Sequence, residues 1–327
     1  MAQDRGQPTD NHAKLSVVIP AHNSERWLPT TLQSVRDQNR KADEVIVVDD
    51  GSQDGSADIA TDFGVDQLVS TGGIGAAGAR NAGAEAASGD WLVFLDADDI
   101  WYPDRLARTA DAVAESSDDA VLYHFDHVAP DSDEVRKRPL PQTAFLESNA
   151  HSVRRGLGSI DYLKWYTRSH IFPGMSACSV RRSTWLHLGG MDVSQTRRHD
   201  LEFFLRFLAA GHTWSYDPVA SSAYRSGQPN NLSANLPDRE RFHQIAIEKN
   251  LDAFRGEEER TLMQAAARHV ARAYLGVAVT HGKADQRRDA VSKLKTRATG
   301  LERWLLPLVA TWTPGLLRRV LLAKRAR

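Results

Sequence analysis

The chain has 327 residues, 41% of them hydrophobic, which is enough for one large domain with an appendage. The single cysteine, Cys178, excludes a disulfide framework and fits a reducing, cytoplasmic compartment. The net charge is −1, but residues 261–327 carry 14 Lys and Arg against 3 Asp and Glu, so a basic tail follows an acidic body. Such a tail indicates an anionic contact, with phospholipid, with nucleic acid or with the body itself.

The first 128 residues alternate between two patterns, after a polar stretch over 1–14 that is expected to be a disordered lead-in. Apolar runs closed by turn residues predict strands over 15–20, 44–48, 65–69, 91–95 and 120–125. Apolar residues at helical spacing predict helices over 24–38, from 56 onward, over 76–87 and over 103–115. Ser24 is the expected N-cap of the first helix, and Pro103 the expected first residue of the last. This order predicts an α/β fold with a mainly parallel sheet, in which ligands bind beyond the carboxyl ends of the strands.

The remainder of the chain follows a different pattern. Residues 129–159 lose the alternation and are expected to form a long connection. A helix is predicted over 199–210, ended by Gly211, and the chain beyond Pro237 reads as helical. After the lead-in we therefore expect a first half over 15–128, a second half over 129–236 and a helical extension over 237–327.

Three carboxylates, on Asp96, Asp98 and Asp99, follow the strand predicted over 91–95. Desolvation and mutual repulsion oppose such a cluster unless a cation relieves both. Side chains two residues apart on an extended backbone point the same way, so Asp96 and Asp98 can face one ion. Their hard oxygen ligands suit Mg²⁺ or Mn²⁺, which usually accompany phosphates. The alternative is a purely structural role, in which one of these carboxylates caps a helix.

Two further segments carry groups that suit a nucleotide. Asp50 follows the second predicted strand, where its carboxylate either accepts a hydrogen bond from a base or closes a turn. A glycine-rich segment over 72–83 contains Arg80, which can bind a phosphate through two hydrogen bonds. The spacing of its glycines also fits a dinucleotide fingerprint, but that fingerprint belongs after the first strand of a sheet, and this segment follows the third.

Asp200 lies in the first turn of the helix predicted over 199–210, with an apolar face that includes Leu201, Phe204 and Leu208. A carboxylate at a helix N-terminus is stabilised as the anion. That environment suits a general base, and it also suits a purely structural aspartate.

Together these segments resemble the family 2 glycosyltransferases, which have the GT-A fold. The resemblance covers about residues 15–232 and is carried by five segments in the family's order, over 17–23, 47–52, 79–83, 94–99 and 189–206. Members of the family transfer a sugar from a nucleotide diphosphate donor with inversion at the anomeric carbon.

The resemblance implies roles for named residues. It implies that the nucleotide sugar contacts Pro20, Asn23, Asp50, Arg80, Asp96, Ala97 and Asp98. It also implies a Mn²⁺ or Mg²⁺ ion held by Asp98 together with Asp96, and Asp200 as the catalytic base. The family's glutamate before this base is replaced by His199, which we expect to titrate near neutral pH.

The implied enzyme is a metal-dependent, inverting glycosyltransferase of cell-surface polysaccharide or glycolipid synthesis. UDP is the favoured donor nucleotide, the acceptor is a saccharide or a lipid-linked saccharide, and nucleic acid is not an expected partner. Tyr224 and Arg225 resemble the start of the family's loop after the base, which either closes over the donor or is a plain surface loop.

Two other functions stay open on the sequence. A nucleotidyltransferase shares the sheet and metal chemistry, but it would carry a basic, glycine-rich loop after the first strand, where this chain has residues 21–24 and only Arg26 nearby. A non-catalytic sugar-binding module of the same fold is the second alternative, and the replacement by His199 is the feature that favours it.

The apolar segment over 304–317 contains two prolines and is followed by Arg318 and Arg319. It is too short to span a bilayer, which takes about 20 residues. Either it lies in the membrane interface on the cytoplasmic side or it packs on the body of the protein.

Overall fold

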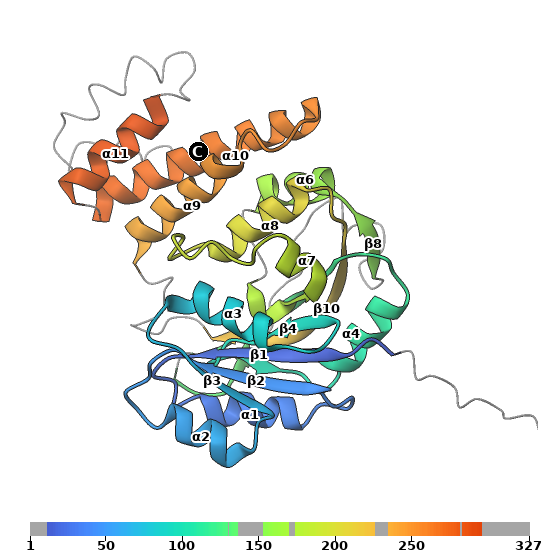
Figure 1. Cartoon of the computed structure of the whole chain (residues 1–327). Coiled ribbons are helices and arrows are strands. Elements are labelled where there is room, and N and C mark those ends of the chain that lie inside the picture. The colour runs from blue at the N-terminus through green and yellow to red at the C-terminus, as the bar shows by residue number, and fades with distance from the viewer. Residues whose placement is uncertain are drawn as a thin grey trace, which may run out of the picture.

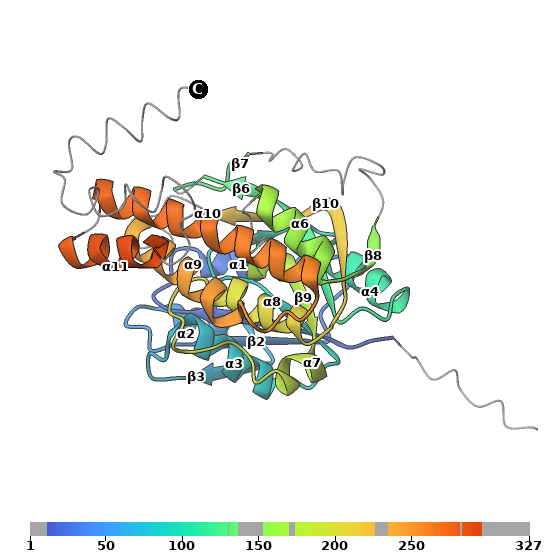
Figure 2. The same cartoon turned by 90° about the horizontal axis from the view of Figure 1, so that it is seen from above.

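The computed structural model describes residues 12–129, 131–136, 153–169, 174–225, 235–281 and 283–295. These residues form one sheet with helices on both faces, and the last helices of the chain add a further layer (Figures 1 and 2). The strands are β1 (Leu15–Ala21), β2 (Glu44–Asp49), β3 (Gln67–Ser70), β4 (Trp91–Phe94), β5 (Ile100–Trp101), β6 (Ala120–Val128), β7 (Val135–Arg136), β8 (Arg154–Leu157), β9 (Cys178–Arg181) and β10 (Trp214–Arg225). The helices are α1 (Leu28–Arg36), α2 (Ser56–Phe63), α3 (Gly75–Ala86), α4 (Arg105–Ala114), α6 (Ser159–Ser169), α7 (Arg182–His187), α8 (His199–Ala209), α9 (Leu236–Asn250), α10 (Glu257–His281) and α11 (Ala284–Lys295).

The first half of the sheet has the order β3-β2-β1-β4, and all of its strands are parallel. Successive side chains of β1 enter opposite cores, as a strand with both faces covered requires. Val17 and Ile19 pack in one core with Leu32 of α1 and Leu106 of α4. Val18 packs in the other core, beneath α3. The parallel, doubly covered sheet expected from the sequence is therefore confirmed.

Helix α3 lies unusually close to the sheet because its residues are small. A Cβ atom added at Gly83 would lie 2.4 Å from Cγ1 of Val18 and 3.0 Å from Cγ2 of Val48. A glycine at this position thus permits a contact that no other residue allows. The close approach brings Arg80, one turn earlier on α3, to the carboxyl ends of β1 and β4.

The second half of the sheet contains strands that the sequence pattern did not predict, among them β9 and β10. β9 lies between β4 and β6 and is antiparallel to both, so β6 keeps the direction of β4. β10 is in turn parallel to β6. β1 to β4, β6 and β10 therefore point the same way, whereas β9, which follows α6 in the chain, runs opposite to them.

Two helix starts differ from the expectation. The first helix begins at Leu28, and Ser24 does not cap it, because the Ser24 hydroxyl bonds to the carbonyl of His22 instead. The fourth begins at Arg105, two residues after Pro103, with Asp104 as the N-cap. The helix predicted over 199–210 is confirmed as α8, and Gly211 follows its end with a φ of +87°.

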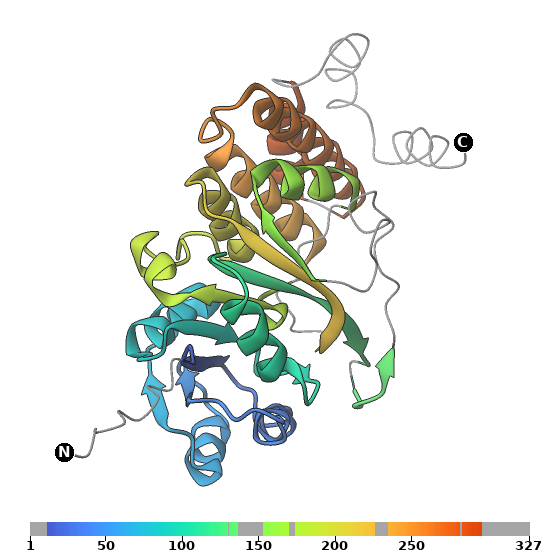
Figure 3. The same ribbon diagram turned by 90° about the vertical axis from the view of Figure 1, so that its right-hand side faces the viewer.

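The helices after β10 form a layer at one end of the molecule, opposite β2, β3 and α2 (Figures 1 and 3). α9 packs on α8, and α10 packs on α6, α9 and α11. α10 begins directly after Gly256 and ends at His281. Within the described ranges no helix combines the length and the apolar character needed to cross a bilayer. The apolar segment over 304–317 lies outside the described residues.

Candidate active site

The turns after β1 and β2 are tied together at the carboxyl edge of the sheet. Asn23 has a φ of +51°, its N–H donates to Oγ of Ser52 at 3.0 Å, and its Oδ1 accepts from the N–H of Gln53 at 2.8 Å. Pro20 lies beside Val48 in the parallel pairing of β1 with β2. Pro20, near the end of β1, and Asn23, in the turn that follows, therefore both lie at the edge of the sheet where the sequence predicts the nucleotide.

The Asp50 carboxylate organises the start of α3. It accepts hydrogen bonds from the hydroxyl of Thr71 and from the N–H groups of Ile74 and Gly75, at 2.6 to 2.7 Å. Burial opposes ionisation of this group, but these hydrogen bonds outweigh it and lower the pKa of Asp50. Recognition of a base by Asp50 stays a prediction, and the structure gives this carboxylate a second role at a helix N-terminus.

Arg80 links the acidic turn after β4 to the start of α8. Its side chain is buried, its Nη2 donates to Oδ1 of Asp96, and its Nη1 donates to Nε2 of His199 at 3.0 Å. Two segments more than a hundred residues apart in the sequence thus meet through one guanidinium. Arg80 Nε is buried without a partner among the described residues, which leaves one donor for a ligand.

His199 is neutral at physiological pH, and the expectation that it titrates near neutrality is wrong. Burial is the main reason, and the positive charge of Arg80 adds to it; together they lower the pKa of His199 to about 4. Because Nε2 accepts from Arg80, the neutral ring carries its proton on Nδ1. The ring therefore serves as a neutral acceptor for Arg80.

This low pKa makes stability depend on pH. In the unfolded chain the imidazole, with a pKa of about 6.5, binds a proton at pH 5, whereas the folded protein does not, so acidification favours unfolding. Between pH 7 and pH 5 we expect the wild type to lose ~2 kcal/mol more stability than His199→Gln, whose amide oxygen can still accept from Arg80. Urea denaturation at both pH values measures this difference, and equal losses in the two proteins would contradict the assignment.

The turn over 96–99 is held from three sides. The hydroxyl of Thr31 on α1 donates to the carbonyls of Ala97 and Asp99, both at 2.9 Å. The hydroxyl of Ser176 accepts from the Asp96 N–H and donates to the Asp99 carboxylate. Arg225 donates its N–H to the same carboxylate at 2.8 Å. Asp99 is thus fully buried and structural, whereas Asp96 and Asp98 remain partly exposed.

Arg225 is the strongest anchor of this turn and corrects the expectation of a surface loop at Tyr224 and Arg225. Its side chain is buried, its Nε donates to the carbonyl of Asp98 at 2.8 Å, and its guanidinium lies 3.9 Å from the ring centroid of Trp27. Both residues belong to the end of β10. Asn230 to Ser233, which complete the expected loop, lie outside the described residues.

The Asp98 carboxylate is the group best suited to a cation. None of the described side chains donates a hydrogen bond to it, and burial followed by the negative charge of Asp96 raises the pKa of Asp98 to about 6. The described residues contain no group of three His, Cys, Asp or Glu that could enclose a metal ion. The protein therefore offers two carboxylates, Asp98 and Asp96, which fits an ion that takes its remaining ligands from phosphate and water.

Asp200 lies in the first turn of α8, directly after His199. It is partly exposed, and the one hydrogen bond that its carboxylate accepts from the described residues comes from the N–H of Leu201, at 2.8 Å. Its other oxygen is available to a substrate hydroxyl. Through His199 and Arg80, this carboxylate is connected to the acidic turn.

The loop before α8 is clamped to α3 by Asn81. The side-chain amide of Asn81 donates to the carbonyl of Met191 at 2.9 Å, and its oxygen accepts from the N–H of the same residue at 2.8 Å. Arg206 of α8 donates to the carbonyls of Leu188 and Gly190. These hydrogen bonds of Asn81 and Arg206 therefore fix the position of α8, which carries Asp200, relative to α3, which carries Arg80.

Replacing Gly190 with Ala is expected to cost about 2–3 kcal/mol of stability. Gly190 has a φ of +67°, and an added Cβ would lie 2.3 Å from Oδ1 of Asn81. Gly64 is a matched control, since its φ is +75° but nothing lies within 4 Å of its Cβ position. Urea denaturation should show that Gly64→Ala costs only the backbone strain, about 1 kcal/mol. Equal losses of stability in the two variants would mean that the Asn81 side chain moves away from the added methyl group at no cost in free energy.

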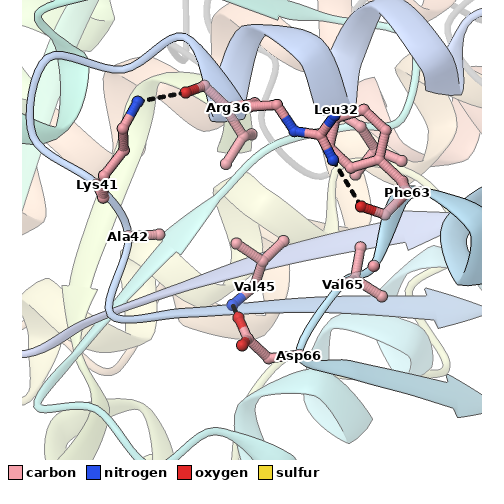
Figure 4. A pocket seen from close by; sticks show the side chains of 10 residues that line it. Leu32, Arg36, Lys41, Ala42, Val45, Phe63, Val65 and Asp66 are labelled. Carbon is pink, nitrogen blue, oxygen red and sulfur yellow. Dashed lines mark hydrogen bonds between the residues drawn. The ribbon is translucent and has the colours of Figure 1, made fainter.

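A hollow of about 210 Å³ lies at the opposite edge of the sheet, where β2 begins (Figure 4). The guanidinium of Arg36 lies 3.6 Å from the ring centroid of Phe63 and donates to its carbonyl at 2.7 Å. The N–H of Val45 at the wall donates to the Asp66 carboxylate. This hollow is at the amino ends of the strands and is separate from the residues described above.

A family model described as glycosyl transferase family 2 matches residues 16–183, just over half of the chain. The amylovoran biosynthesis glycosyltransferase AmsB of Erwinia amylovora is 33% identical over 146 residues, which are 41% of this chain and 48% of that protein. The chain spans less than two thirds of the length of the first curated relatives it matches.

Solved structures with the same fold cover most of the chain. TarS 1–349 of S. aureus in complex with UDP-GlcNAc has a TM-score of 0.68 at 18% identity, with 90% of this chain and 86% of that chain covered. The mannosyltransferase PcManGT from Pyrobaculum calidifontis in complex with GDP-Man and Mn²⁺ has a TM-score of 0.60 at 17% identity, with 92% and 80% covered. These likenesses show the GT-A fold that the sequence predicts.

Proposed function

The chain belongs to glycosyl transferase family 2, and on that premise we propose that it moves a sugar from a nucleotide diphosphate donor to an acceptor hydroxyl, with inversion at the anomeric carbon. The observation that carries this proposal is the pair of hydrogen bonds that joins Asp96 through Arg80 to His199, the residue that directly precedes Asp200. It joins an acidic turn suited to a cation with a partly exposed carboxylate suited to a base. A purely structural role for the acidic turn would not account for the partly exposed carboxylate of Asp200, and a structural role for Asp200 would not account for the acidic turn.

The donor would lie along the carboxyl ends of β1, β2 and β4. Asp98 and Asp96 would hold a Mn²⁺ or Mg²⁺ ion, which when bound would neutralise the charge of the diphosphate. Arg80 would donate its free Nε–H to a phosphate oxygen, and Pro20, Asn23, Asp50 and Ala97 would line the nucleotide. UDP is the favoured nucleotide, because TarS is solved in complex with UDP-GlcNAc. The Mn²⁺ that accompanies GDP-Man in PcManGT supports the proposed cation.

Asp200 would act on the acceptor. Its carboxylate would take the proton of the attacking hydroxyl while the new bond from that oxygen to the anomeric carbon forms and the bond from the same carbon to the phosphate oxygen breaks. The leaving nucleoside diphosphate gains negative charge, which Arg80 would stabilise. The neutral His199 would keep the guanidinium of Arg80 in place without adding a second positive charge.

We also propose a division of labour along the chain, with donor binding over 15–128, acceptor binding and the base over 129–236, and a helical extension over 237–327. The acceptor would be a saccharide, free or lipid-linked, of a cell-surface polysaccharide or glycolipid. The relative named for amylovoran biosynthesis supports this class. We place the reaction in the cytoplasm, with the basic tail as a candidate for peripheral membrane contact.

A thermal-shift screen of UDP-, GDP- and dTDP-sugars, with and without Mn²⁺, tests the proposed function first. Donor binding stabilises the protein by mass action, so one nucleotide series should raise the melting temperature, and only when the metal is present. The donor found in this way is then incubated with the enzyme, and the released sugar is identified by NMR. Release of sugar with inverted anomeric configuration is expected, whereas formation of a nucleoside triphosphate and a sugar 1-phosphate once pyrophosphate is added would identify a nucleotidyltransferase instead.

A further inference from the structure

Two adjacent arginines, Arg197 and Arg198, precede His199 and Asp200 at the start of α8. Both are partly buried, and the Nε atom of each is shielded from solvent and lacks a hydrogen-bond partner. Neither guanidinium forms an ion pair or a hydrogen bond with any residue in the described part of the chain. A partly buried guanidinium without a counter-charge is destabilising, so this arrangement favours the binding of an anion.

The other arginines near the site contrast with this pair. Arg80 is bonded to Asp96, Arg206 to Glu202, and Arg225 to the carbonyl of Asp98. The fold therefore supplies a partner for each of these three arginines. Arg197 and Arg198 are available to a ligand.

Arg198 also has a strained backbone. Its φ of +57° and ψ of +24° place it in the left-handed region, and of the non-glycine residues described only Asn23 shares a positive φ. Such a conformation is strained in a residue with a Cβ and is concentrated at binding sites. The fold thus accepts both a strained backbone and an unpaired charge at one residue, next to the proposed base.

The surroundings of Arg198 place it toward the second half of the protein and the helical extension. Burial raises the pKa of Tyr166 on α6, and the positive charge of Arg198 is the largest effect that opposes this rise. The Tyr166 hydroxyl is hydrogen-bonded to His243 of α9, so Arg198 faces the region where α6, α8 and α9 meet. The charges that act most strongly on Asp98 come instead from Asp96, Arg225 and Arg80.

Inversion requires the acceptor hydroxyl and the leaving diphosphate to lie on opposite sides of the anomeric carbon. Arg80 is bonded to the acidic turn that we propose to hold the donor, whereas the charge of Arg198 acts on Tyr166, in the half of the chain that we propose to bind the acceptor. Building on the proposed function, we propose that Arg197 and Arg198 bind an anionic group of the acceptor, a phosphate or a carboxylate, close to the hydroxyl that Asp200 deprotonates. Each guanidinium would donate paired N–H groups to the two oxygens of the anion. The acceptor is therefore an acidic saccharide or a saccharide phosphate.

Inorganic phosphate is the probe for this site, used on the full chain already saturated with its nucleotide diphosphate and Mg²⁺. The melting temperature is measured with phosphate and with NaCl at the same ionic strength. Phosphate should raise it for the wild type, and the rise should be lost in the double variant Arg197→Gln with Arg198→Gln. The double variant Arg255→Gln with Arg260→Gln is the matched control, because both residues are exposed, at or just before the start of α10, and the pair loses the same charge. It should keep the full response.

Calorimetric titration with the nucleotide diphosphate separates the two sides of the site. The affinity of the double variant for the nucleotide should remain within threefold of the wild type; a tenfold loss would assign the arginines to the donor and overturn the proposal. A parallel measurement with acetate distinguishes a phosphate from a carboxylate on the acceptor. The anion that gives the larger rise in melting temperature identifies the acceptor group. A wild type that fails to bind any nucleotide diphosphate would refute the proposed function, whereas one that binds it without a phosphate response would refute only this inference.

The ligand-free double variant gives a second readout. Removal of two partly buried, unpaired charges should leave its melting temperature equal to or above that of the wild type. A lower melting temperature would show that the guanidinium groups are already satisfied within the fold, against the inference.

Discussion

Replacing Asp200 with Asn is expected to abolish sugar transfer while donor binding persists. The amide has nearly the same shape as the carboxylate and can still accept from the N–H of Leu201, so the start of α8 should keep its conformation. It cannot take a proton from the acceptor hydroxyl, and loss of a general base typically lowers kcat by ~10²–10⁴-fold. Donor affinity by calorimetry should change less than threefold, because the residues proposed to hold the nucleotide are untouched.

The matched control is Asp252→Asn, at an exposed position between α9 and α10, which should keep full turnover. Circular dichroism and the melting temperature establish that both variants are folded. A folded Asp200→Asn variant with undiminished kcat would remove the base from this position. A variant that also loses the donor would mean that the carboxylate has a binding role instead.

Replacing Asp98 with Asn is expected to weaken metal-dependent donor binding by at least tenfold, or about 1.4 kcal/mol. Asp98 is the carboxylate of the turn that no described side chain donates to, so the variant loses a ligand for the cation without breaking a bond of the fold. Because removal of one carboxylate also relieves its repulsion with Asp96, the variant should be as stable as the wild type or slightly more stable.

Calorimetric titration with and without EDTA provides the control. With the metal removed, Asp98→Asn should bind the donor nucleotide at least as well as the wild type, since the substitution also removes a negative charge that repels the diphosphate. Equal affinities in the presence of Mn²⁺ would contradict the role of Asp98. A variant that is weaker even in EDTA would show a direct contact between Asp98 and the donor.

Much of the first half of the protein could be predicted from the sequence, because its strands obey local rules. β1, β2 and β4 are continuous apolar runs that end in turn residues, and parallel strands bring those ends to one edge. This alone placed Asp50, Asp96 and Asp98 together. β9 escaped prediction because its position depends on pairing with β4 and β6, both distant in the sequence, and Cys178–Arg181 is too short and polar to signal a strand.

The chemistry of the site was harder to predict because burial and partners are tertiary properties. The low pKa of His199 follows from its burial beside Arg80, which is a residue of another helix, α3. Ser176 and Arg225 lie far from the acidic motif in the sequence, yet both hold its turn. The unpaired state of Arg198 is likewise visible only when its neighbours are known. A basic dipeptide before the base was the signal available in the sequence.

The central claim is that Asp98 and Asp96 bind a divalent cation that holds the donor diphosphate within reach of Arg80. The most direct test is a crystal structure with the nucleotide diphosphate and Mn²⁺, in which anomalous scattering locates the metal. We expect the ion at ~2.1 Å from an oxygen of the Asp98 carboxylate and bridged to both phosphates. A diphosphate bound elsewhere, or a metal peak with no oxygen of either aspartate among its ligands, would contradict the account.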